Sequence, residues 1–251
     1  MSGESRWVVG VDVGGTFTDL CLMNEGTGEH RVAKVPSQRG DEAQGFMHGI
    51  QSTGVALSEV GGVIHGTTVG TNALLERKGA KTGLITTRGF RDVLEMRRRD
   101  RPHTWGLWGE FEPVIPRNLR LEVTERTLAS GEIRTGVDLE EVREAAELLL
   151  ERGAEAVCVV FINAYANDEN ERLAAEALKA VWPNGYVNTS SAILPEIREF
   201  ERTSTTALNG YLQPVVGSYL KCLEADLREG GLDGDFLIVQ SNGGVMSVGN
   251  P

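Results

Sequence analysis

The chain has 251 residues, of which 40% are hydrophobic and 24% are charged, a composition typical of a folded globular protein and not of a disordered one. The formal net charge of −11 at pH 7 argues against a general nucleic-acid binder and against a protein that binds anionic membranes. No stretch approaches the roughly 18 consecutive apolar residues of a membrane-spanning helix, and the first residues, MSGESR, are unlike a signal peptide.

The first hundred residues predict an antiparallel meander followed by helix–strand units. Between residues 6 and 35, three short apolar runs are joined by two tight, Gly-containing turns, which is the pattern of a three-stranded meander. After residue 40, apolar residues at helical spacing alternate with short strands, which indicates parallel pairing. The predicted strands are 6–13, 17–23, 31–35, 60–65 and 81–87, and the predicted helices are 41–53, 69–77 and 90–99.

The remainder of the chain continues the α/β pattern after an insertion near residues 100–136. The insertion begins with an irregular stretch rich in Trp, Pro and Gly at 100–116, and it contains a predicted hairpin with strands at 121–127 and 132–135. Asp138 is predicted to cap the next helix, and Pro195 is predicted to open a long helix that breaks near Pro214. The other predicted elements are helices at 139–152 and 168–181 and strands at 156–162, 186–188 and 236–240.

The sharpest chemical signal lies in the first predicted hairpin. An acid, Asp12, comes at the end of a buried strand, and two glycines, hydroxyl side chains and a second acid follow it. Glycines let the backbone approach a phosphate and adopt positive φ, backbone amides can line an anion-binding concavity, and a strand-end carboxylate can orient Mg²⁺ beside phosphates. We therefore predict that Asp12 is catalytic and binds the metal, and that the following residues bind the cofactor: Gly14, Gly15, Thr16, Thr18 and, as support of the hairpin, Asp19.

This hairpin differs from the two common phosphate-binding motifs. The pattern matches neither the P-loop nor the dinucleotide fingerprint, because it lacks Gly-Lys-Ser/Thr and opens a strand instead of a helix. The plain alternative is a Gly-rich hairpin with an acid at its mouth. The complete nine-residue pattern favours the phosphate-binding interpretation.

A second candidate region follows the predicted strand 60–65. His65 stands at the carboxyl end of that strand, and Thr67 and Thr68 precede a helix. Ligands bind at this edge of open α/β sheets, and the free amides there favour anions. His65 is a candidate proton donor or ligand of a substrate carbonyl, with a satisfied structural histidine as the alternative. Thr67 and Thr68 are weaker substrate candidates, and either could simply be the helix cap.

Two weaker candidates complete the site. Arg91 belongs to a basic cluster between residues 91 and 101, which could recognise a substrate carboxylate or a partner's acidic surface, or could be a solvated face paired with Glu95. Asn242 and Gly243 follow a buried strand, where the backbone can contact a ligand or form a plain turn.

The cysteines do not indicate catalysis or metal binding. Cys21, Cys158 and Cys222 are too few and too scattered for a disulfide framework or a structural zinc site. They predict reduced core thiols in a cytoplasmic protein. None has a histidine as its neighbour in the sequence, so thiol catalysis has no support.

Five segments in combination resemble the hydantoinase A / 5-oxoprolinase family. The segment DVGGTFTD at 12–19 resembles the first phosphate loop of the actin-like ATPase superfamily, to which that family belongs. The resemblance extends from about residue 6 to residue 247. The other four segments are HGTTVGTNA at 65–73, RGFRDVLE at 88–95, LPEIREFERT at 194–203 and QSNGG at 240–244.

The resemblance implies a fold and a domain arrangement. The implied fold is α/β, a ribonuclease H-like domain of the actin ATPase type in which a three-strand meander precedes helix–strand units. The implied domains are an N-terminal ATPase domain at 1–190 and the beginning of the following domain at 191–251. Family members carry a second Gly-Gly-Thr loop, and this sequence has none, so we expect it to be incomplete relative to the family.

The resemblance also implies a chemistry. Members of the family use ATP and Mg²⁺ to phosphorylate the carbonyl of a small cyclic amide or ketone, and they commonly work in hetero-oligomers with a hydantoinase B-type subunit. We predict the N-terminal part of an ATP-dependent cyclic-amide hydrolase acting on a hydantoin or 5-oxoproline. One alternative is a subunit of an ATP-dependent ketone carboxylase. Another, from a different class, is a non-catalytic nucleotide-binding or assembly module.

Overall fold

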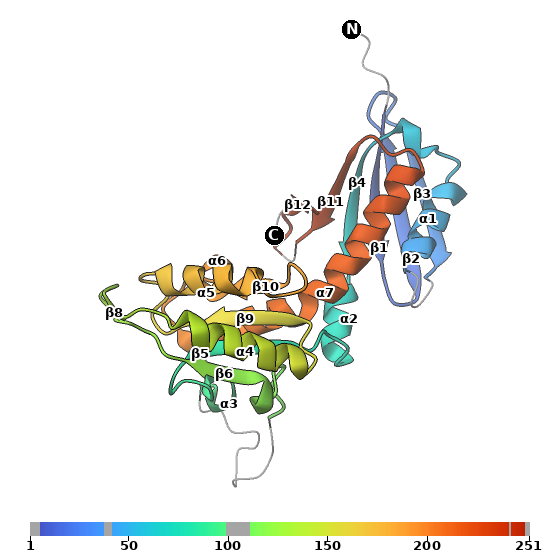
Figure 1. Cartoon of the computed structure of the whole chain (residues 1–251). Helices are drawn as coiled ribbons and strands as arrows, with labels where there is room; N and C mark the ends of the chain where they lie inside the picture. Colours follow the sequence, from blue (N-terminus) through green and yellow to red (C-terminus); the bar gives the residue numbers. More distant parts are fainter. Residues whose placement is uncertain (1–5, 38–41, 99–110, 241, 249–251) are drawn as a thin grey trace. The chain divides into compact units, whose positions relative to one another are not determined.

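The computed structural model describes residues 6–37, 42–98, 111–240 and 242–248. The chain forms two compact units: unit 1 contains residues 1–77 and 215–251, and unit 2 contains residues 78–214 (Figure 1). One long helix, α7 (Glu199–Glu229), crosses from unit 2 to unit 1. No helix in the described part of the chain is long and apolar enough to cross a membrane.

Unit 1 is built on a mixed sheet with the strand order β12-β11-β4-β1-β2-β3. The first three strands pair antiparallel in sequence, while β4 pairs parallel with β1 and β11 pairs parallel with β4. This arrangement confirms the predicted meander and the predicted α/β class. The elements of unit 1 are β1 (Trp7–Val13), β2 (Phe17–Asn24), β3 (His30–Pro36), α1 (Glu42–Ser52), a 3-10 turn (Leu57–Glu59), β4 (Val60–Thr67), α2 (Val69–Leu75), the second half of α7, β11 (Asp235–Val239) and β12 (Val245–Ser247).

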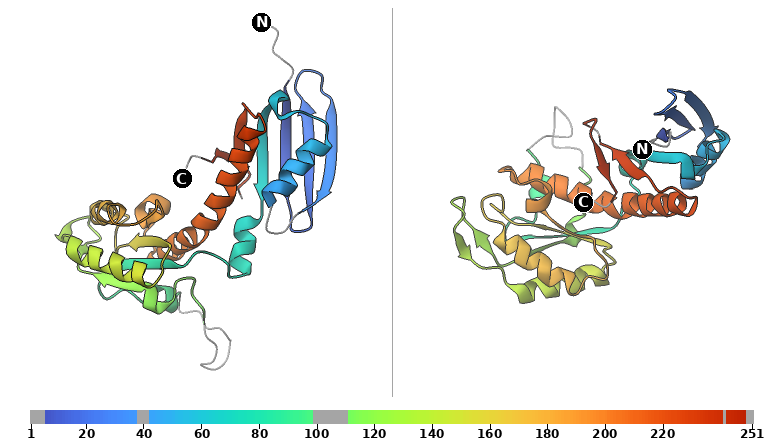
Figure 2. Two further views of the ribbon diagram at one scale, coloured as in Figure 1. Left: turned by 45° about the vertical axis from the view of Figure 1, so that its right-hand side comes forward. Right: turned by 90° about the horizontal axis from the view of Figure 1, so that it is seen from above.

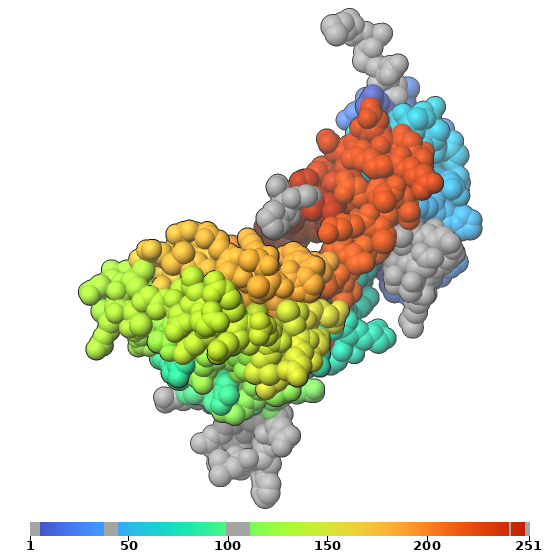
Figure 3. Space-filling model, in the orientation of Figure 1, coloured from blue at the N-terminus to red at the C-terminus, as the bar shows by residue number. Residues whose placement is uncertain are grey.

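The two faces of the unit 1 sheet have different environments. Burial alternates along β2, where Leu20 and Leu22 pack in one cluster with Phe46 of α1 and Leu223 of α7. Both helices therefore cover the same face (Figure 2), and in the space-filling view α7 lies in front of much of the sheet (Figure 3). Because side chains of a strand alternate between faces, the residues between these leucines point to the opposite face, which we call the open face.

Unit 2 contains a parallel sheet with the strand order β10-β9-β5-β6. Neighbouring residues of β5 contact different helices: a Cβ at Gly83 would lie 2.6 Å from Leu149 of α4, whereas a Cβ at Gly210 of α7 would lie 3.0 Å from Thr82. Helices α4 and α7 thus cover opposite faces. The elements of unit 2 are β5 (Thr82–Thr87), α3 (Val93–Met96), a 3-10 turn (Arg117–Leu119), β6 (Arg120–Val123), β7 (Arg126–Thr127), β8 (Ile133–Thr135), α4 (Leu139–Glu151), β9 (Ala156–Val160), α5 (Glu169–Lys179), β10 (Val187–Thr189), α6 (Ser190–Ile193) and the first half of α7.

Several predicted elements are confirmed and others are corrected. The Asp138 side chain accepts hydrogen bonds from the Glu140 and Glu141 amides, as a helix cap does. The predicted hairpin is shorter than expected, because residues 120–123 form β6 and pair parallel with β5, which leaves only β7 and β8 in the hairpin. The predicted helix at 90–99 is reduced to α3. Residue 99 of that predicted helix and residues 100–110 of the predicted insertion lie outside the described residues.

The long helix also differs from its prediction. Pro195 lies between α6 and α7 and starts neither of them, and α7 runs through Pro214 without interruption. Proline lacks the amide that would bond to residue 210, but α7 packs in the cores of both units on either side of it, through Ala207 in one and Leu223 in the other. The two compact units divide the chain at 77/78 and 214/215, not near residue 190 where we expected a domain boundary.

Candidate functional site

The candidate site begins at the loop between β1 and β2. The Gly14 amide donates to the Phe17 carbonyl oxygen at 3.0 Å and closes the turn. A Cβ at Gly14 would lie 3.1 Å from that oxygen, whereas one at Gly15 would meet nothing within 4 Å. Neither glycine has positive φ, so that expectation was wrong. The close approach of the Phe17 carbonyl favours glycine at position 14, and Gly15 is exposed with open space on the side where a Cβ would lie.

Ser37, which follows β3, fixes the back of this loop. Its hydroxyl donates to the Gly14 carbonyl at 2.7 Å, and its amide donates to the Thr16 carbonyl at 2.9 Å. The same hydroxyl lies 3.0 Å from the Thr18 hydroxyl, and Thr18 is 0% exposed. Thr18 therefore supports the loop from inside and does not present its hydroxyl to a phosphate as predicted. Thr16 remains exposed.

Asp12 lies on the open face beside the loop, and its side chain is exposed. Among the described residues it has no hydrogen-bond or ion-pair partner. The parallel register sets Gly66 of β4 next to it, and a Cβ at Gly66 would lie 3.5 Å from Asp12 Oδ1. The described residues include no group of three or more His, Cys, Asp or Glu side chains that could hold a metal. A single carboxylate with space around it fits Mg²⁺ held mainly by water and phosphate oxygens.

Asp19 lies next to Asp12 across the hairpin but is already paired. Asp12 and Asp19 are register partners, and Lys34 Nζ lies 2.7 Å from Asp19 Oδ1 and 2.9 Å from Oδ2. The ammonium also lies 5.0 Å from the centre of the Phe17 ring. Since Lys34 neutralises Asp19, Asp12 is the one of the two acids left to meet a cation. This agrees with the supporting role expected for Asp19.

Three loops lie at the carboxyl edge of the unit 1 sheet, where β1, β4 and β11 end. Thr67 is the register partner of Val13, and its hydroxyl accepts a hydrogen bond from the Val69 amide at 3.2 Å. The Thr68 hydroxyl accepts one from Asn72 Nδ2 at 3.2 Å. The turn after β11 holds Asn242, exposed, and Gly243 at a φ of 85°. The edge thus brings the loop together with both threonines and this turn.

His65 faces the core and not this edge. It is 0% exposed, packs among Phe46, Phe236 and Tyr219, and its Nε2 lies 2.9 Å from the Tyr219 hydroxyl. Desolvation by burial lowers the pKa of His65 to about 4. The predicted catalytic histidine is therefore a neutral core residue in this structure, and its position gives it no access to a substrate.

Arg91 is not part of the unit 1 edge, because it belongs to unit 2. It is half-buried in the turn before α3, where its carbonyl oxygen accepts a bond of 3.5 Å from Arg120 and its Nε is buried without a hydrogen-bond partner in the described part of the chain. The structure gives no support to a substrate-binding role for this residue.

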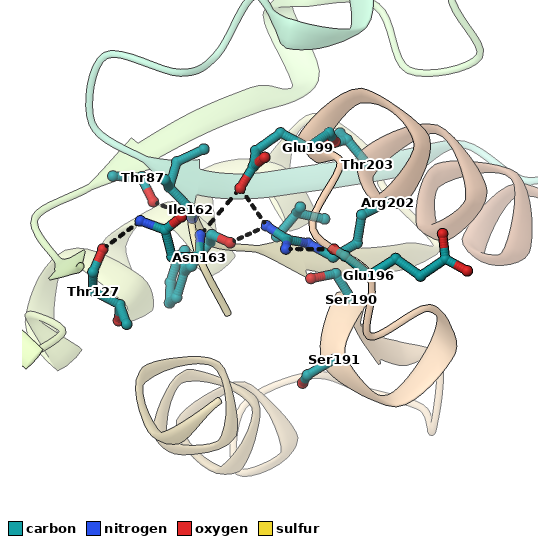
Figure 4. A network of polar contacts seen from close by, with 12 residues as sticks. Thr87, Thr127, Ile162, Asn163, Ser190, Ser191, Glu196, Glu199, Arg202 and Thr203 are labelled. Atoms are coloured by element: carbon teal, nitrogen blue, oxygen red, sulfur yellow. Dashed lines mark hydrogen bonds and ion pairs between the residues drawn. The ribbon is translucent and has the colours of Figure 1, made fainter. Parts of the chain in front are cut away.

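The carboxyl edge of the unit 2 sheet is closed by a polar network (Figure 4). The order of the strands reverses between β5 and β9, which is where ligands bind in open parallel sheets. There, Asn163, with a φ of 60°, donates from its amide to Glu199 at 3.2 Å and from its side chain to the Thr127 carbonyl at 2.9 Å. The buried Arg202 side chain donates to the carbonyls of Phe161 at 2.6 Å and Glu196 at 3.1 Å.

Buried acids lie behind this network. The Glu171 carboxylate accepts hydrogen bonds from the amides of Phe161 and Ser191, both at 2.8 Å, and from the Ser190 hydroxyl at 2.5 Å. Glu125 accepts hydrogen bonds from the Thr87 hydroxyl and from Asn170. Burial raises the pKa of both carboxyls. These acids are occupied by protein donors and are not available to a ligand.

Sequence reasoning missed three residues of the unit 1 site. Strand pairing brings Gly66 and Lys34 near the loop, and the end of β3 brings Ser37 there. These contacts join residues that are distant in the sequence. The alternation of β2 did carry one usable signal, since Thr18 shares a face with Leu20 and Leu22 and is buried with them.

Comparison with known proteins identifies the family. Residues 8–182 match the model of the hydantoinase/oxoprolinase N-terminal region, and residues 202–251 match the hydantoinase/oxoprolinase model. The chain belongs to the hydantoinase/oxoprolinase family. The resemblance seen in the sequence is confirmed. An uncharacterised protein of Methanocaldococcus jannaschii is 39% identical over 96% of this chain and 36% of its own length.

Two solved structures share the fold of this hydantoinase/oxoprolinase chain. The structure of the ATP-dependent caprolactamase from Pseudomonas jessenii matches with a TM-score of 0.84 at 31% identity, over 95% of this chain and 36% of that one. The nucleotide-free structure of acetone carboxylase matches with a TM-score of 0.84 at 27% identity, over 98% and 38%. The fold is therefore the mixed α/β fold of actin-like ATPase domains, and the chain spans little more than a third of the length of these relatives.

The family contains ATP-dependent enzymes of two kinds. Relatives include cyclic-amide hydrolases and subunits of ketone carboxylases. Several of them are named as alpha, beta or gamma subunits, which indicates assemblies of different chains.

Proposed function

We propose that this chain provides the phosphate-binding part of an ATP-dependent hydrolase that opens a small cyclic amide of the hydantoin or 5-oxoproline type. The observation that carries the proposal is the unpaired, exposed Asp12 beside the Gly14–Thr16 loop, with Gly66 leaving space next to its carboxylate. Asp19, the register partner of Asp12, is neutralised by Lys34, and the buried Glu125 and Glu171 of unit 2 accept hydrogen bonds from protein donors. A carboxylate kept free beside an exposed backbone loop suits a cation that accompanies phosphates.

Each residue of the loop has a separate task in this proposal. Gly15 and Thr16 present exposed backbone and a hydroxyl to the phosphates, while Gly14, Thr18 and Ser37 hold the loop in shape. Asp12 would hold Mg²⁺ through its waters, and the ion would supply charge neutralisation for the transferring phosphoryl group. Because the loop is tied to β3 through Ser37, its amides are oriented before the ligand arrives, which is the condition for electrostatic stabilisation of a transition state.

A ketone carboxylase is the second candidate, favoured by the TM-score of 0.84 to acetone carboxylase. Phosphorylation of a carbonyl oxygen would serve both reactions, so the phosphate loop does not discriminate between them. We further propose that the chain acts in a hetero-oligomer with a hydantoinase B-type subunit, in keeping with the subunit names of its relatives.

The test of the phosphate site is Asp12→Asn in the complete native enzyme, with Mg·ATP turnover as the readout. We expect turnover to fall by at least about a hundredfold, the size of effect seen when one group that stabilises transition-state charge is removed. The matched control is Asp235→Asn, because Asp235 is also exposed, in the same sheet but at its opposite edge. Wild-type turnover in Asp12→Asn would falsify the assignment.

Product analysis decides between hydrolase and carboxylase. The wild-type enzyme is incubated with Mg·ATP and a panel of hydantoins, lactams and ketones, with and without bicarbonate. We expect ring-opened products that do not depend on bicarbonate. Consumption of a ketone only when bicarbonate is present would instead establish the carboxylase.

A further inference from the structure

The open face of the unit 1 sheet is a continuous apolar surface. Register pairs run across five strands in the order Leu237, Ile64, Gly10, Cys21 and Val32. Two residues further along the strands, the next set of register partners on this face includes Val8 and Met23 in one direction and Val239 in the other. Val32 is 80% exposed, Met23 42% and Val239 41%. Among the described residues, no helix covers these side chains.

Such exposure is unusual for this kind of sheet. Strands β1, β4 and β11 pair in parallel, and parallel strands normally have both faces covered. Here only the face that carries Val9, Val11 and Val63 is packed under α1 and α7. Exposed apolar surface on this scale marks an interaction site in soluble proteins.

The shape of the open face fits a helix. The two central strands present glycines at Gly10, Gly62 and Gly66, which leave a trough between the side chains of the outer strands. A hollow of about 920 Å³ lies over it, bounded by Cys21 and Val32 on one side and Val239 on the other. Of the apolar side chains, only Val8 and Ile64 project from this floor between the glycines, so a helix can approach the backbone closely at the glycines and pack between the aliphatic rims.

We propose that an amphipathic helix from the region of the family protein that this chain does not span docks on the open face. The length of the relatives supports this occupant, because the chain accounts for only 36% of the caprolactamase alpha subunit and 38% of the acetone carboxylase chain that it matches. The apolar rows accept the apolar side of the helix. The last row, with Asp12, Asp19 and Lys34, is polar and limits how far the helix extends toward the phosphate loop.

Cys21 provides a probe in the middle of this surface. Cys21 and Cys222 are exposed, so the prediction of core thiols was wrong for both and holds only for Cys158. In a Cys222→Ser background Cys21 is the accessible thiol, because Cys158 is buried with its pKa raised to about 12 by desolvation. Alkylation by N-ethylmaleimide is measured in the isolated chain and in the native assembly purified through a tag on this protein. We expect Cys21 to react at least about tenfold more slowly in the assembly, because access limits thiol reactivity.

The matched control is a thiol placed elsewhere on unit 1. Leu75 is 76% exposed at the end of α2 and does not belong to the open face, so Leu75→Cys should react at the same rate in both samples. Equal rates for Cys21 in the isolated chain and in the assembly would overturn the proposal. Protection of Cys21 by ATP in the isolated chain would assign the hollow to a nucleotide, and protection that grows with the concentration of the isolated chain would assign it to a second copy. Either result also rejects the helix.

A charge on the open face tests the same proposal without a thiol. We expect Val32→Asp to prevent the assembly seen by size-exclusion chromatography, and to leave the melting temperature of the isolated chain unchanged because Val32 is exposed there. Leu75→Asp should preserve assembly. A photocrosslinker at position 32 should capture a peptide with helical apolar periodicity from outside this sequence, and capture of a peptide from within it would reject the proposed occupant. None of these readouts depends on ATP turnover, so they stand apart from the test of Asp12.

Discussion

The carboxyl edges of the two sheets occupy the same topological position and have opposite character. At the unit 1 edge, Asp12 is exposed and unpaired beside an exposed loop. At the unit 2 edge, Glu125 and Glu171 are buried, and protein donors satisfy their carboxylates. Open α/β sheets bind ligands at this position. The difference teaches that the position alone does not make a site, because the acids must also be free of internal partners.

What closes the unit 2 edge is the start of α7. The buried guanidinium of Arg202 ties the helix to the end of β9 through the Phe161 carbonyl, and Glu199 accepts a hydrogen bond from the Asn163 amide. Among the described residues of unit 1, no buried arginine closes the carboxyl edge in this way. Ser37 holds one side of the β1–β2 loop, and the other side is exposed. The closed carboxyl edge of unit 2 and the exposed carboxyl edge of unit 1 can each be tested.

The largest effect is expected from breaking the closed edge. Arg202→Ala should lower the free energy of unfolding by about 3 to 5 kcal/mol, since removal of one partner of a buried charged network leaves its other members unsatisfied. Urea denaturation measures the change. The control is Arg198→Ala, one turn earlier and exposed, which should change the free energy of unfolding by less than about 0.5 kcal/mol. Equal effects of the two substitutions would show that Arg202 does not close the edge.

The next largest effect is a pH dependence of folding stability that has opposite signs in the two units. The folded-state pKa of His65 is lowered from 6.5 to about 4, so between these values the unfolded chain binds the extra proton and the stability of unit 1 rises with pH, by up to about 3 kcal/mol. In unit 2, the pKa of Glu125 is raised above its ordinary value of 4.5. Protons then bind more tightly to the folded state, and this group makes stability fall as pH rises above 4.5.

Hydrogen exchange, corrected for its intrinsic pH dependence, measures the two trends separately. Amides in β1 and β4 should gain protection between pH 4 and 6.5. His65→Gln should abolish that gain, whereas His48→Gln should preserve it because His48 is exposed. Glu125→Gln should reduce the opposite trend in β5 and β9. Identical pH profiles in both sheets would contradict the assignment of these groups.

The smallest effect is expected at the open edge. The side chains of Lys34 and Asp19 are 56% and 54% exposed, so their ion pair should contribute less than about 1 kcal/mol to stability, as exposed pairs generally do. A double-mutant cycle of Lys34→Ala and Asp19→Ala measures this contribution, which should decrease with added salt. A coupling energy as large as the effect of Arg202→Ala would mean that the open edge is held together like the closed one.

The sequence patterns predicted the local parts of the fold and missed the non-local ones. The meander and the parallel strands followed from apolar periodicity and turns, and the Asp12 loop from a strand-end acid next to two glycines. Residues 121–123 were assigned to a hairpin because their true partner, β5, is distant in the sequence. Proline at 214 predicted a break, but packing on both sides of it maintains the helix.

The sequence also did not show which face of a sheet is covered, and therefore whether a given side chain is buried or exposed. His65 follows Val63 and Ile64 in an apolar strand, and such a strand carries no polar alternation to show which side is covered. Its burial depends on α1 and α7, which contribute Phe46 and Tyr219. Similarly, the space beside Asp12 depends on Gly66 in a neighbouring strand, which only the register reveals.

The two crossings of the chain at 77/78 and 214/215 have a consequence for biosynthesis. All of unit 2 leaves the ribosome before β11, which completes the parallel part of the unit 1 sheet. Domains fold as units during translation, usually in the order of their synthesis. Here the amino-terminal meander must wait for its last parallel strand, so the internal unit is the first to reach its native state.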